Sequence, residues 1–227
     1  MDSTPHILWV DATLLVIDKP AGLRSLPDGY NPALPHVRAL LEPQYGRLWM
    51  VHRLDKETSG VMLLARSAPM HRLLNTLFEK RQLHKWYHAL ASGAPGWDET
   101  TLDLPLRPNG DRRHRTVVDP QQGKPAITRL RVLERYPQAV LVEAQPETGR
   151  THQIRAHLAA CGLPILGDDL YGGQTPPGLP LETLALHARA LAFSHPESGQ
   201  PLHFEAPYPP AFQATLSWLR SQGRELP

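Results

Sequence analysis

Prolines and glycines interrupt this chain throughout its length. They number 24 and 16 among 227 residues, and they occur from one end to the other. Because these residues end helices and strands and favour turns, the sequence predicts many short elements and not a few long ones. The chain has no internal repeat, no low-complexity tract and no clear linker. We therefore expect a single domain that spans residues 1–227.

Short apolar runs between the turns indicate more strands than helices. Since the strands do not alternate regularly with the helices, we expect an α+β fold. Its sheet should be mixed and mainly antiparallel, with flanking helices. The expected strands are 14–18, 48–51, 61–65, 85–91, 128–136, 139–144 and 184–193, and the expected helices are 67–81, 151–160 and 210–222.

The helix expected at residues 67–81 has both a start signal and an apolar face. Ser67 can cap its first turn. Apolar residues recur at helical spacing at Leu73, Leu74, Leu77 and Phe78. We expect these four side chains to form the buried stripe of the helix.

Composition excludes several classes of protein. Hydrophobic residues make up 41% and charged residues 20%, as in ordinary globular proteins. No apolar run approaches the ~20 residues of a membrane span, and the first residues lack a secretory signal. The single cysteine, Cys161, excludes an internal disulfide and a multi-cysteine zinc site. We expect a cytoplasmic monomer that does not associate with membranes.

Positive charge is concentrated in one segment. The net charge is only +2 and the pI is near 8.8, which alone does not indicate a nucleic-acid partner. Between residues 105 and 131, however, there are seven basic and two acidic residues, a local excess of 7 − 2 = +5. Such a segment suits a phosphate backbone, although a solvated loop whose charges pair elsewhere fits equally well. The basic residues are Arg107, Arg112, Arg113, Arg115, Lys124, Arg129 and Arg131.

Residues 51–60 (VHRLDKETSG) form a polar loop between two apolar strands. Asp55 lies in this loop beside Arg53 and Lys56, and nearby positive charge favours the ionised carboxylate. An ionised aspartate on a rigid scaffold can act as a nucleophile or a general base. Taken alone, the segment fits a turn aspartate that caps its own backbone even better.

Residues 147–157 (ETGRTHQIRAH) read as a turn that opens a helix. Thr151, Arg155 and Leu158 would share one helix face, so Arg155 could point back toward a carboxylate at the sheet edge. An ordinary surface helix is the alternative. His152 and His157 do not share a helix face, so we expect no metal site there.

Residues 85–90 (KWYHAL) read as a strand on which Lys85, Tyr87 and Ala89 share one face. A tyrosine ring offers a flat stacking surface for an unstacked base, and its hydroxyl can donate or accept a proton. A cross-strand core aromatic is an equally good interpretation of Tyr87 from this strand alone.

Together these segments resemble the RluA-type family of pseudouridine synthases. Residues 15–23 (LVIDKPAGL) resemble the first family motif, and 52–60 (HRLDKETSG) the second. Residues 85–87 match the Lys-x-Tyr motif. Residues 148–155 (TGRTHQIR) resemble the third motif, and residues 164–168 (PILGD) and 186–188 (LHA) match later family segments. The motifs occur in family order over residues 7–209, which makes the resemblance specific.

The resemblance implies a pseudouridine synthase catalytic domain with a central RNA-binding cleft, acting without cofactor or metal. It makes Asp55 the catalytic carboxylate, Tyr87 the active-site tyrosine and Arg155 the arginine that pairs with Asp55. Arg53 matches the residue that fills the gap left by a flipped base. We assign RNA contacts to His52, Arg53, Arg107, Arg112, Arg113, Arg115, Lys124 and Arg150.

The expected partner is structured RNA, either ribosomal RNA or a tRNA stem-loop. The first motif begins almost at the start of the chain, so we expect no N-terminal S4 domain, as in the short RluA branch. Two alternatives remain. One is a non-catalytic RNA-binding or ribosome assembly module. The other is a magnesium-dependent aspartyl phosphotransferase, suggested by Asp55 and by the acidic pair Asp168 and Asp169.

Overall fold

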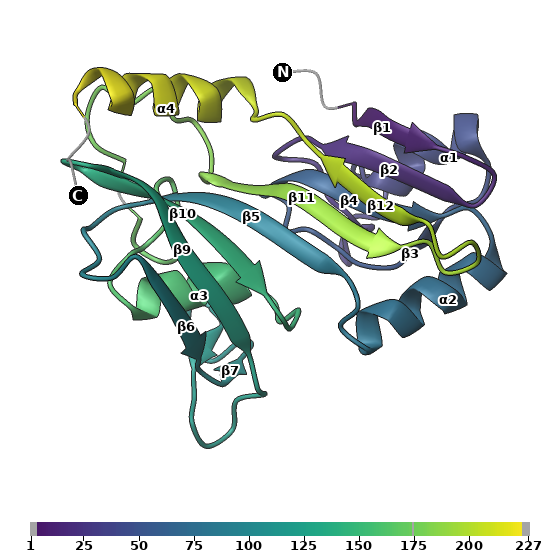
Figure 1. Cartoon of the computed structure of the whole chain (residues 1–227), viewed down its shortest axis with the longest axis horizontal. Helices are drawn as coiled ribbons and strands as arrows, with labels where there is room; N and C mark the ends of the chain where they lie inside the picture. Colours follow the sequence, from purple (N-terminus) through teal and green to yellow (C-terminus); the bar gives the residue numbers. More distant parts are fainter. Residues whose placement is uncertain (1–3, 174, 224–227) are drawn as a thin grey trace. The chain divides into compact units, whose positions relative to one another are not determined.

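A computed structural model describes residues 4–173 and 175–223 of the chain (Figure 1). Contacts divide the described residues into two compact units. Unit 1 comprises residues 4–85 and 188–207, and unit 2 comprises the described residues of 86–187 and 208–223. The strands are β1 His6–Val10, β2 Leu14–Lys19, β3 Trp49–Met50, β4 Ser59–Ala65, β5 His84–Ala91, β6 Glu99–Asp103, β7 Leu106–Arg107, β8 Val117–Val118, β9 Ile127–Tyr136, β10 Ala139–Pro146, β11 Leu186–Ser194 and β12 Pro201–Glu205. The helices are α1 Val37–Tyr45, α2 Ala68–Glu79, α3 Gln153–Ala160 and α4 Pro210–Ser221.

In unit 1, β2 is paired antiparallel with both β1 and β4. The short strand β3 also pairs with β4, and β11 pairs antiparallel with β12. Strand β4 lies next to β11. Their close approach requires a residue without a side chain, because a Cβ atom on Gly60 would lie 2.2 Å from the carbonyl oxygen of Ala188.

The core of unit 1 is formed by alternate residues of β2, β4 and β11 and by helix α2. Ser67 caps α2 as expected, since its side chain accepts a hydrogen bond from the Met70 backbone N–H. The buried residues of the helix are Met70 and Leu74, whereas Leu73 is 38% exposed. The expected stripe was therefore wrong at Leu73. The buried face of the helix begins at Met70 and continues through Leu74, and it does not include Leu73.

Unit 2 is built on a sheet with the strand order β5-β10-β9-β6, in which each neighbouring pair is antiparallel (Figure 1). Residues 137 and 138 form the tight turn between β9 and β10. Helix α3 packs on the sheet face that carries Thr128 and Leu130. Its apolar residues join those of α4 in a second core, so each unit has a hydrophobic core of its own.

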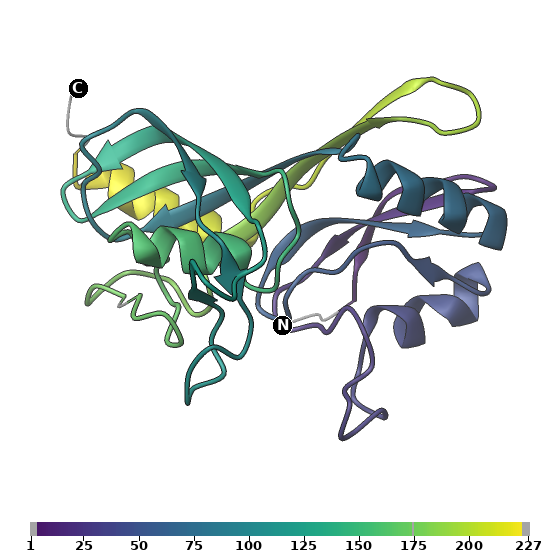
Figure 2. The ribbon, with the colours of Figure 1, turned by 90° about the horizontal axis from the view of Figure 1, so that it is seen from below.

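Strands β7 and β8 form a separate two-stranded ribbon in unit 2. We call residues 104–126, which contain this ribbon and its flanking turns, the basic hairpin. Figure 2 shows it extending away from the sheet of its unit. Its base is held by Leu106 and Ala126, which are buried against Ala156 of α3, so an apolar contact anchors a segment that otherwise carries many charges.

The structure confirms the expected α+β class with a mainly antiparallel sheet. It places elements that were not expected at β1, α1, β6, β7, β8 and β12. Helix α3 begins at Gln153 and not at Thr151, because His152 adopts a left-handed backbone conformation with φ of 53°. None of the helices in the described ranges has the length and apolar character needed to cross a membrane. The single domain and the central cleft stay predictions.

Candidate active site

Asp55 lies in the loop of unit 1 between β3 and β4, and this loop is fixed by buried hydrogen bonds. The Ser25 hydroxyl donates to the Leu54 carbonyl oxygen at 2.7 Å and accepts from the Leu54 N–H at 3.1 Å. The N–H of Thr58 donates to the Asp55 carbonyl oxygen at 3.1 Å. Asp55 is half-buried, between buried Leu54 and exposed Lys56. The backbone on both sides of its side chain is thus held in place.

A fully buried lysine, Lys19, also supports this loop. The ammonium group of Lys19 donates to the carbonyl oxygens of Pro20, Leu23 and Lys56 at 2.9, 2.8 and 3.1 Å. An ammonium group has three N–H donors, so these three acceptors match its capacity. The N–H of Gly22 also donates to the Lys56 carbonyl oxygen, at 2.9 Å. Lys19 was part of a recognised motif, but no pattern in the residues indicated this role.

Three carboxylates lie near Lys19, two from the Asp55 loop and one from β2. Burial lowers the pKa of Lys19 to about 7, and the carboxylates of Glu57, Asp55 and Asp18 oppose that change. Glu57 is in turn 3.0 Å from the ammonium group of Lys56.

His52 supports the adjacent strand from within unit 1. Its Nε2 atom accepts a hydrogen bond from the Leu63 N–H at 2.9 Å, and its ring stacks on Phe78 with centroids 5.1 Å apart. Burial, together with the charge of Lys85, lowers the pKa of His52 to about 3, so the ring is neutral at physiological pH. These contacts describe a structural histidine, and an RNA contact by His52 stays a prediction. Arg53, in contrast, is exposed.

Tyr87 lies on β5 in unit 2, directly opposite Ala144 of β10. Its side chain is half-buried and packs against the core of this unit. Pairing with β10 therefore holds the backbone that carries the ring, while part of the side chain stays accessible to a ligand.

Arg155 is held by a buried carboxylate in unit 2. Its Nε donates to Oδ2 of Asp168 at 2.7 Å and its Nη2 to Oδ1 at 2.8 Å, a two-point ion pair. The Asp168 side chain is completely buried. The Arg155 guanidinium carbon also lies 5.1 Å from the centre of the Tyr171 ring. The expected pairing of Arg155 with Asp55 joins residues of different units and stays a prediction.

The helix that carries Arg155 is not a surface helix, because residues 153–158 are all buried. Gln153 connects its start to the sheet: its amide nitrogen donates to the Ile127 carbonyl oxygen and the Thr128 hydroxyl, both at 2.9 Å. Its amide oxygen accepts from the Thr148 hydroxyl at 2.7 Å and the Arg150 N–H at 3.0 Å. Through the hydrogen bonds of Gln153, the motif at residues 148–155 connects the start of α3 to β9 and to the turn after β10.

The remaining candidate metal ligands have other partners. His157 is buried between the Thr128 hydroxyl at 2.9 Å and the Leu104 carbonyl oxygen at 3.0 Å. Both carboxylate oxygens of Asp168 are bound to Arg155, which does not favour a magnesium site there. Within residues 4–173 and 175–223, no cluster of three histidine, cysteine or acidic side chains could hold a metal ion.

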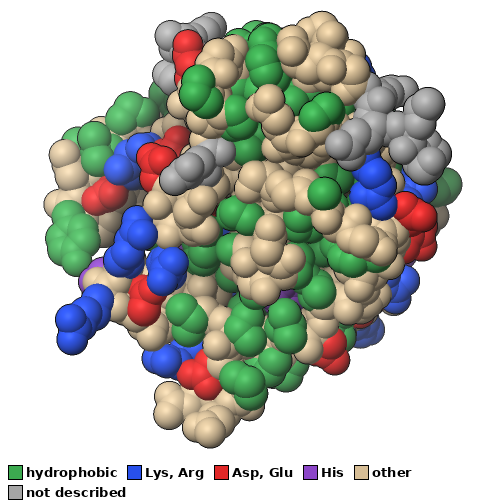
Figure 3. All heavy atoms as spheres, turned by 90° about the vertical axis from the view of Figure 1, so that its left-hand side faces the viewer, with side chains coloured by type: hydrophobic (Ala, Val, Ile, Leu, Met, Phe, Trp, Pro, Cys, Tyr) green, Lys and Arg blue, Asp and Glu red, His purple; other side chains and the backbone are tan. Residues whose placement is uncertain are grey.

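The basic segment is partly neutralised by carboxylates. Ion pairs join Arg107 to Asp119 and Arg115 to Asp111, both at 2.6 Å. Two further pairs join Arg129 to Glu147 at 2.7 Å and Arg131 to Glu143 at 3.1 Å. In the face drawn in Figure 3, acidic side chains are interspersed among the cations. The local excess of charge counted along the sequence is thus reduced by carboxylates of β10 and of the turn that follows it.

The other cations of the basic hairpin are exposed at its surface. These are Arg112, Arg113 and Lys124. Arg113 donates to the Asp169 carbonyl oxygen at 2.9 Å. Arg150 donates to the Pro125 carbonyl oxygen at 3.1 Å and so helps to hold the end of the hairpin. RNA contacts by the hairpin stay predictions.

Comparison with known proteins assigns the family. The pattern of the RNA pseudouridylate synthase family matches residues 13–160, which include the Asp55 loop and Arg155. The chain is 41% identical over 233 residues to the ribosomal large subunit pseudouridine synthase D of Xanthomonas campestris, covering 95% of this chain and 69% of the relative. The chain belongs to the RNA pseudouridylate synthase family. It is an RNA pseudouridine synthase.

Other relatives agree with this assignment. The chain is 39% identical to the ribosomal large subunit pseudouridine synthase C of Salmonella typhimurium, covering 95% of this chain and 70% of the relative. It is 40% identical to an uncharacterised RNA pseudouridine synthase of Zymomonas mobilis, covering 91% of this chain and 95% of that protein.

The chain is 31% identical in sequence to human RNA pseudouridylate synthase domain containing 4, whose structure has been solved. The two superpose with a TM-score of 0.79, covering 98% of this chain and 94% of the human one. The resemblance to the RluA-type family is therefore confirmed, and the fold of the family is confirmed with it. The roles of the individual site residues stay predictions.

Proposed function

We propose that this synthase converts uridine to pseudouridine in large-subunit ribosomal RNA, with Asp55 as the catalytic carboxylate. The observation that supports this assignment is the fixed loop around Asp55. Ser25 holds the residue before it, Lys19 holds the residue after it, and the side chain between them is half-buried. A carboxylate on such a rigid support needs little reorganisation to act on a bound nucleotide.

The reaction breaks the bond between N1 of uracil and C1′ of ribose and forms a bond between C5 and C1′. The proton on C5 is lost and one is regained at N1, so the reaction is an isomerisation without a redox step. Asp55 would act at the sugar, either by adding to C1′ or by removing a proton from C2′. Both routes require the ionised carboxylate.

Three other residues would assist Asp55 in this proposal. Arg155, oriented by Asp168, would pair with the Asp55 carboxylate and keep it ionised. Tyr87 would stack on the uracil ring and help to move the C5 proton. The base must leave its stack before reaction, at a cost of a few kcal/mol. Exposed Arg53 would fill the space that the base vacates.

The names of several relatives specify the large ribosomal subunit, which supports ribosomal RNA as the substrate. Exposed cations of the basic hairpin would bind its phosphates. A reaction on ribosomal RNA would take place in the cytoplasm.

Asp55→Asn tests the catalytic role, since it keeps size and polarity but removes the ionisable group. The substrate is a bacterial large-subunit ribosomal RNA transcript made with 5-tritiated uridine, and tritium release reports turnover. We expect release to fall by at least about 10⁴-fold, with RNA affinity changed less than about three-fold. Asp98→Asn, at a side chain that is 90% exposed, is the control and should keep full activity.

The outcomes separate the parts of the proposal. Tritium release by Asp55→Asn at the wild-type rate would show that another group performs the chemistry. A wild-type protein that binds the transcript without releasing tritium would instead point to a different RNA, such as a tRNA, or to a non-catalytic role. Site-resolved pseudouridine mapping in total RNA from a strain that lacks the gene distinguishes these two.

A further inference from the structure

The turn after α3 forms a closed polar structure around Arg155. Besides binding the guanidinium, Oδ1 of Asp168 accepts from the Tyr171 N–H at 3.2 Å. The turn closes on itself through the Gly173 N–H, which donates to the Asp168 carbonyl oxygen at 2.9 Å. A Cβ atom on Gly173 would lie 1.6 Å from the Ile165 carbonyl oxygen, so only glycine fits there. Arg155 is thus bound by a turn whose backbone conformation is closely restricted.

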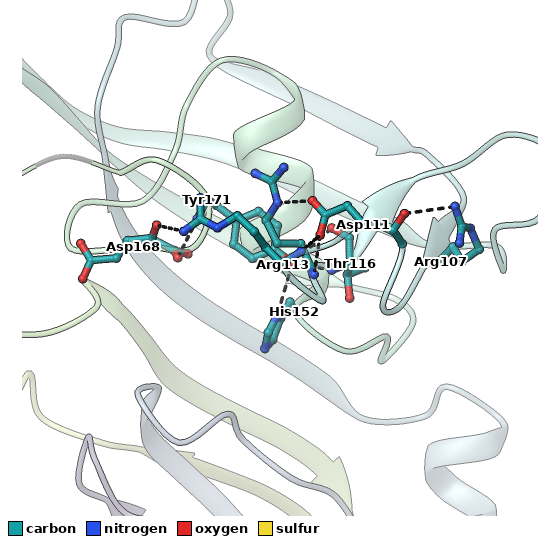
Figure 4. Close-up of polar contacts among 10 residues, drawn as sticks. Arg107, Asp111, Arg113, Thr116, His152, Asp168 and Tyr171 are labelled. Atoms are coloured by element: carbon teal, nitrogen blue, oxygen red, sulfur yellow. Dashed lines mark hydrogen bonds and ion pairs between the residues drawn. The ribbon is translucent and has the colours of Figure 1, made fainter.

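Tyr171 connects this turn to the basic hairpin. Its hydroxyl accepts from the Thr116 N–H at 2.9 Å and donates to the Thr116 carbonyl oxygen at 3.1 Å. Nδ1 of His152 lies 3.2 Å from the same hydroxyl (Figure 4). The phenol thus donates one hydrogen bond to Thr116 and accepts one from it. Burial raises the pKa of Tyr171, which keeps the phenol protonated and able to donate.

The hairpin side of this connection is a backbone segment next to several cations. Thr116 is buried and follows the run of charged residues from 111 to 115. A second contact lies beside it, from the Arg113 guanidinium to the Asp169 carbonyl oxygen at 2.9 Å. The hairpin and the turn that binds Arg155 are therefore in direct contact, and a displacement of the hairpin by bound RNA would also displace the turn.

We propose that Tyr171 is a positioning residue that couples the docking of RNA on the basic hairpin to the orientation of Arg155. This inference rests on the proposed role of Arg155 beside Asp55. The hydroxyl fixes the hairpin to the turn, and the ring of the same side chain covers the guanidinium. A hairpin held by RNA phosphates would limit the motion of Tyr171, and through it the motion of Arg155.

Tyr171→Phe tests the coupling because it keeps the ring over Arg155 and removes only the hydroxyl. Single-turnover tritium release is measured with the full chain in excess over 5-tritiated large-subunit ribosomal RNA transcript, at saturating protein. We expect the rate constant to fall about ten-fold, since small misplacements of a catalytic group have effects of this size. The melting temperature should stay at the wild-type value.

Comparing the rate constant with the melting temperature separates positioning from a purely structural role. A variant that only destabilises the fold has a lower melting temperature but keeps the wild-type rate constant, because folded protein is still in excess over the RNA. Tyr136→Phe is the matched control, because Tyr136 is another tyrosine of unit 2 whose hydroxyl makes a hydrogen bond, donating to Glu134 at 2.7 Å. We expect Tyr136→Phe to keep the wild-type rate constant.

A second variant tests the link to the hairpin. Replacing residues 107–117 by three glycines removes Thr116 together with the four arginines of the hairpin, Arg107, Arg112, Arg113 and Arg115. If the hairpin acts through Tyr171, this variant should lose about the same factor in rate constant at saturation, and adding Tyr171→Phe should lower it no further. A wild-type rate constant in Tyr171→Phe, or multiplicative losses in the combined variant, would overturn the coupling. The activity of the wild-type chain in the same assay tests the proposed function separately.

Discussion

The Asp55 loop of unit 1 and the Arg155 turn of unit 2 are held by different kinds of interaction. Around Asp55, the supporting side chains bind the main chain: Ser25 binds both backbone groups of Leu54, and Lys19 binds three carbonyl oxygens. Around Arg155, the supporting side chains bind the functional side chain itself, through the carboxylate of Asp168 and the ring of Tyr171.

The difference reflects what each residue requires. An aspartate is short, so fixing its backbone fixes its carboxylate. An arginine has a long flexible side chain, and fixing its Cα leaves the guanidinium free to move unless partners bind it directly. Substitutions near Asp55 should therefore act mainly on stability, whereas those near Arg155 should act mainly on rate.

Lys19→Met should break the unit 1 support most severely. Methionine fills most of the same volume but leaves three carbonyl oxygens without their donor, and buried unsatisfied acceptors are costly. Removal of the buried charge offsets part of that cost. We expect a loss of about 3 kcal/mol in the free energy of unfolding, measured by urea denaturation.

Lys80→Met is the control for this substitution. Lys80 is an exposed lysine of the same unit, at the end of α2, and its replacement should change the free energy of unfolding by less than about 0.5 kcal/mol. Equal effects of the two substitutions would mean that the carbonyl oxygens bound by Lys19 contribute nothing particular to unit 1.

His52 adds a pH dependence to unit 1. Its pKa is about 3 in the folded state and near 6.5 in an unfolded chain. Below pH 6.5 the unfolded state therefore binds the extra proton, and stability is lost as pH falls from 6.5 toward 3. From the two pKa values we expect this group to lower the free energy of unfolding by roughly 2 kcal/mol between pH 8 and pH 5.

His52→Gln keeps an acceptor near the Leu63 N–H and removes the titration. Urea denaturation at a series of pH values should show a shallower loss of stability on the acid side for this variant. His203→Gln, at an exposed histidine of β12, should retain the wild-type slope. An unchanged slope in His52→Gln would show that His52 titrates at its ordinary pKa in the folded protein.

Some parts of this architecture could be predicted from sequence. The polar run around Asp55 between two apolar segments placed a loop correctly, and Ser67 marked the start of α2. Other parts depend on contacts between distant residues. Lys19 binds the carbonyl oxygen of a residue 37 positions away, and Asp168 binds Arg155 across 13 positions. Local periodicity does not contain such pairings, so the lysine support and the partner of Arg155 became evident only in the folded chain.

Ser25→Ala should weaken the Asp55 loop less than Lys19→Met. It removes two hydrogen bonds to Leu54 but leaves the Lys19 contacts in place. We expect a loss of about 1–2 kcal/mol in the free energy of unfolding by urea denaturation. Ser198→Ala, at an exposed serine of the same unit, should lose less than about 0.5 kcal/mol. If Ser25→Ala matches that control, the serine does not hold the loop.

The smallest expected effect concerns the arginines of unit 2. Some of them form ion pairs with carboxylates, and others are exposed cations of the hairpin. Arg112 is an exposed cation of the hairpin, whereas Arg129 is paired with Glu147 at 2.7 Å. Arg112→Gln removes one net positive charge. The double variant Arg129→Gln with Glu147→Gln removes none.

If Arg112 binds a phosphate, its loss should reduce the slope of log affinity against log salt concentration by about 0.7–0.9, and affinity by a few-fold. The double variant should keep the wild-type slope. The measurement is filter binding of large-subunit ribosomal RNA transcript over a series of KCl concentrations. Equal reductions in slope for both variants would mean that RNA displaces Glu147 from Arg129, and that the paired arginines of unit 2 serve RNA binding as directly as the unpaired ones.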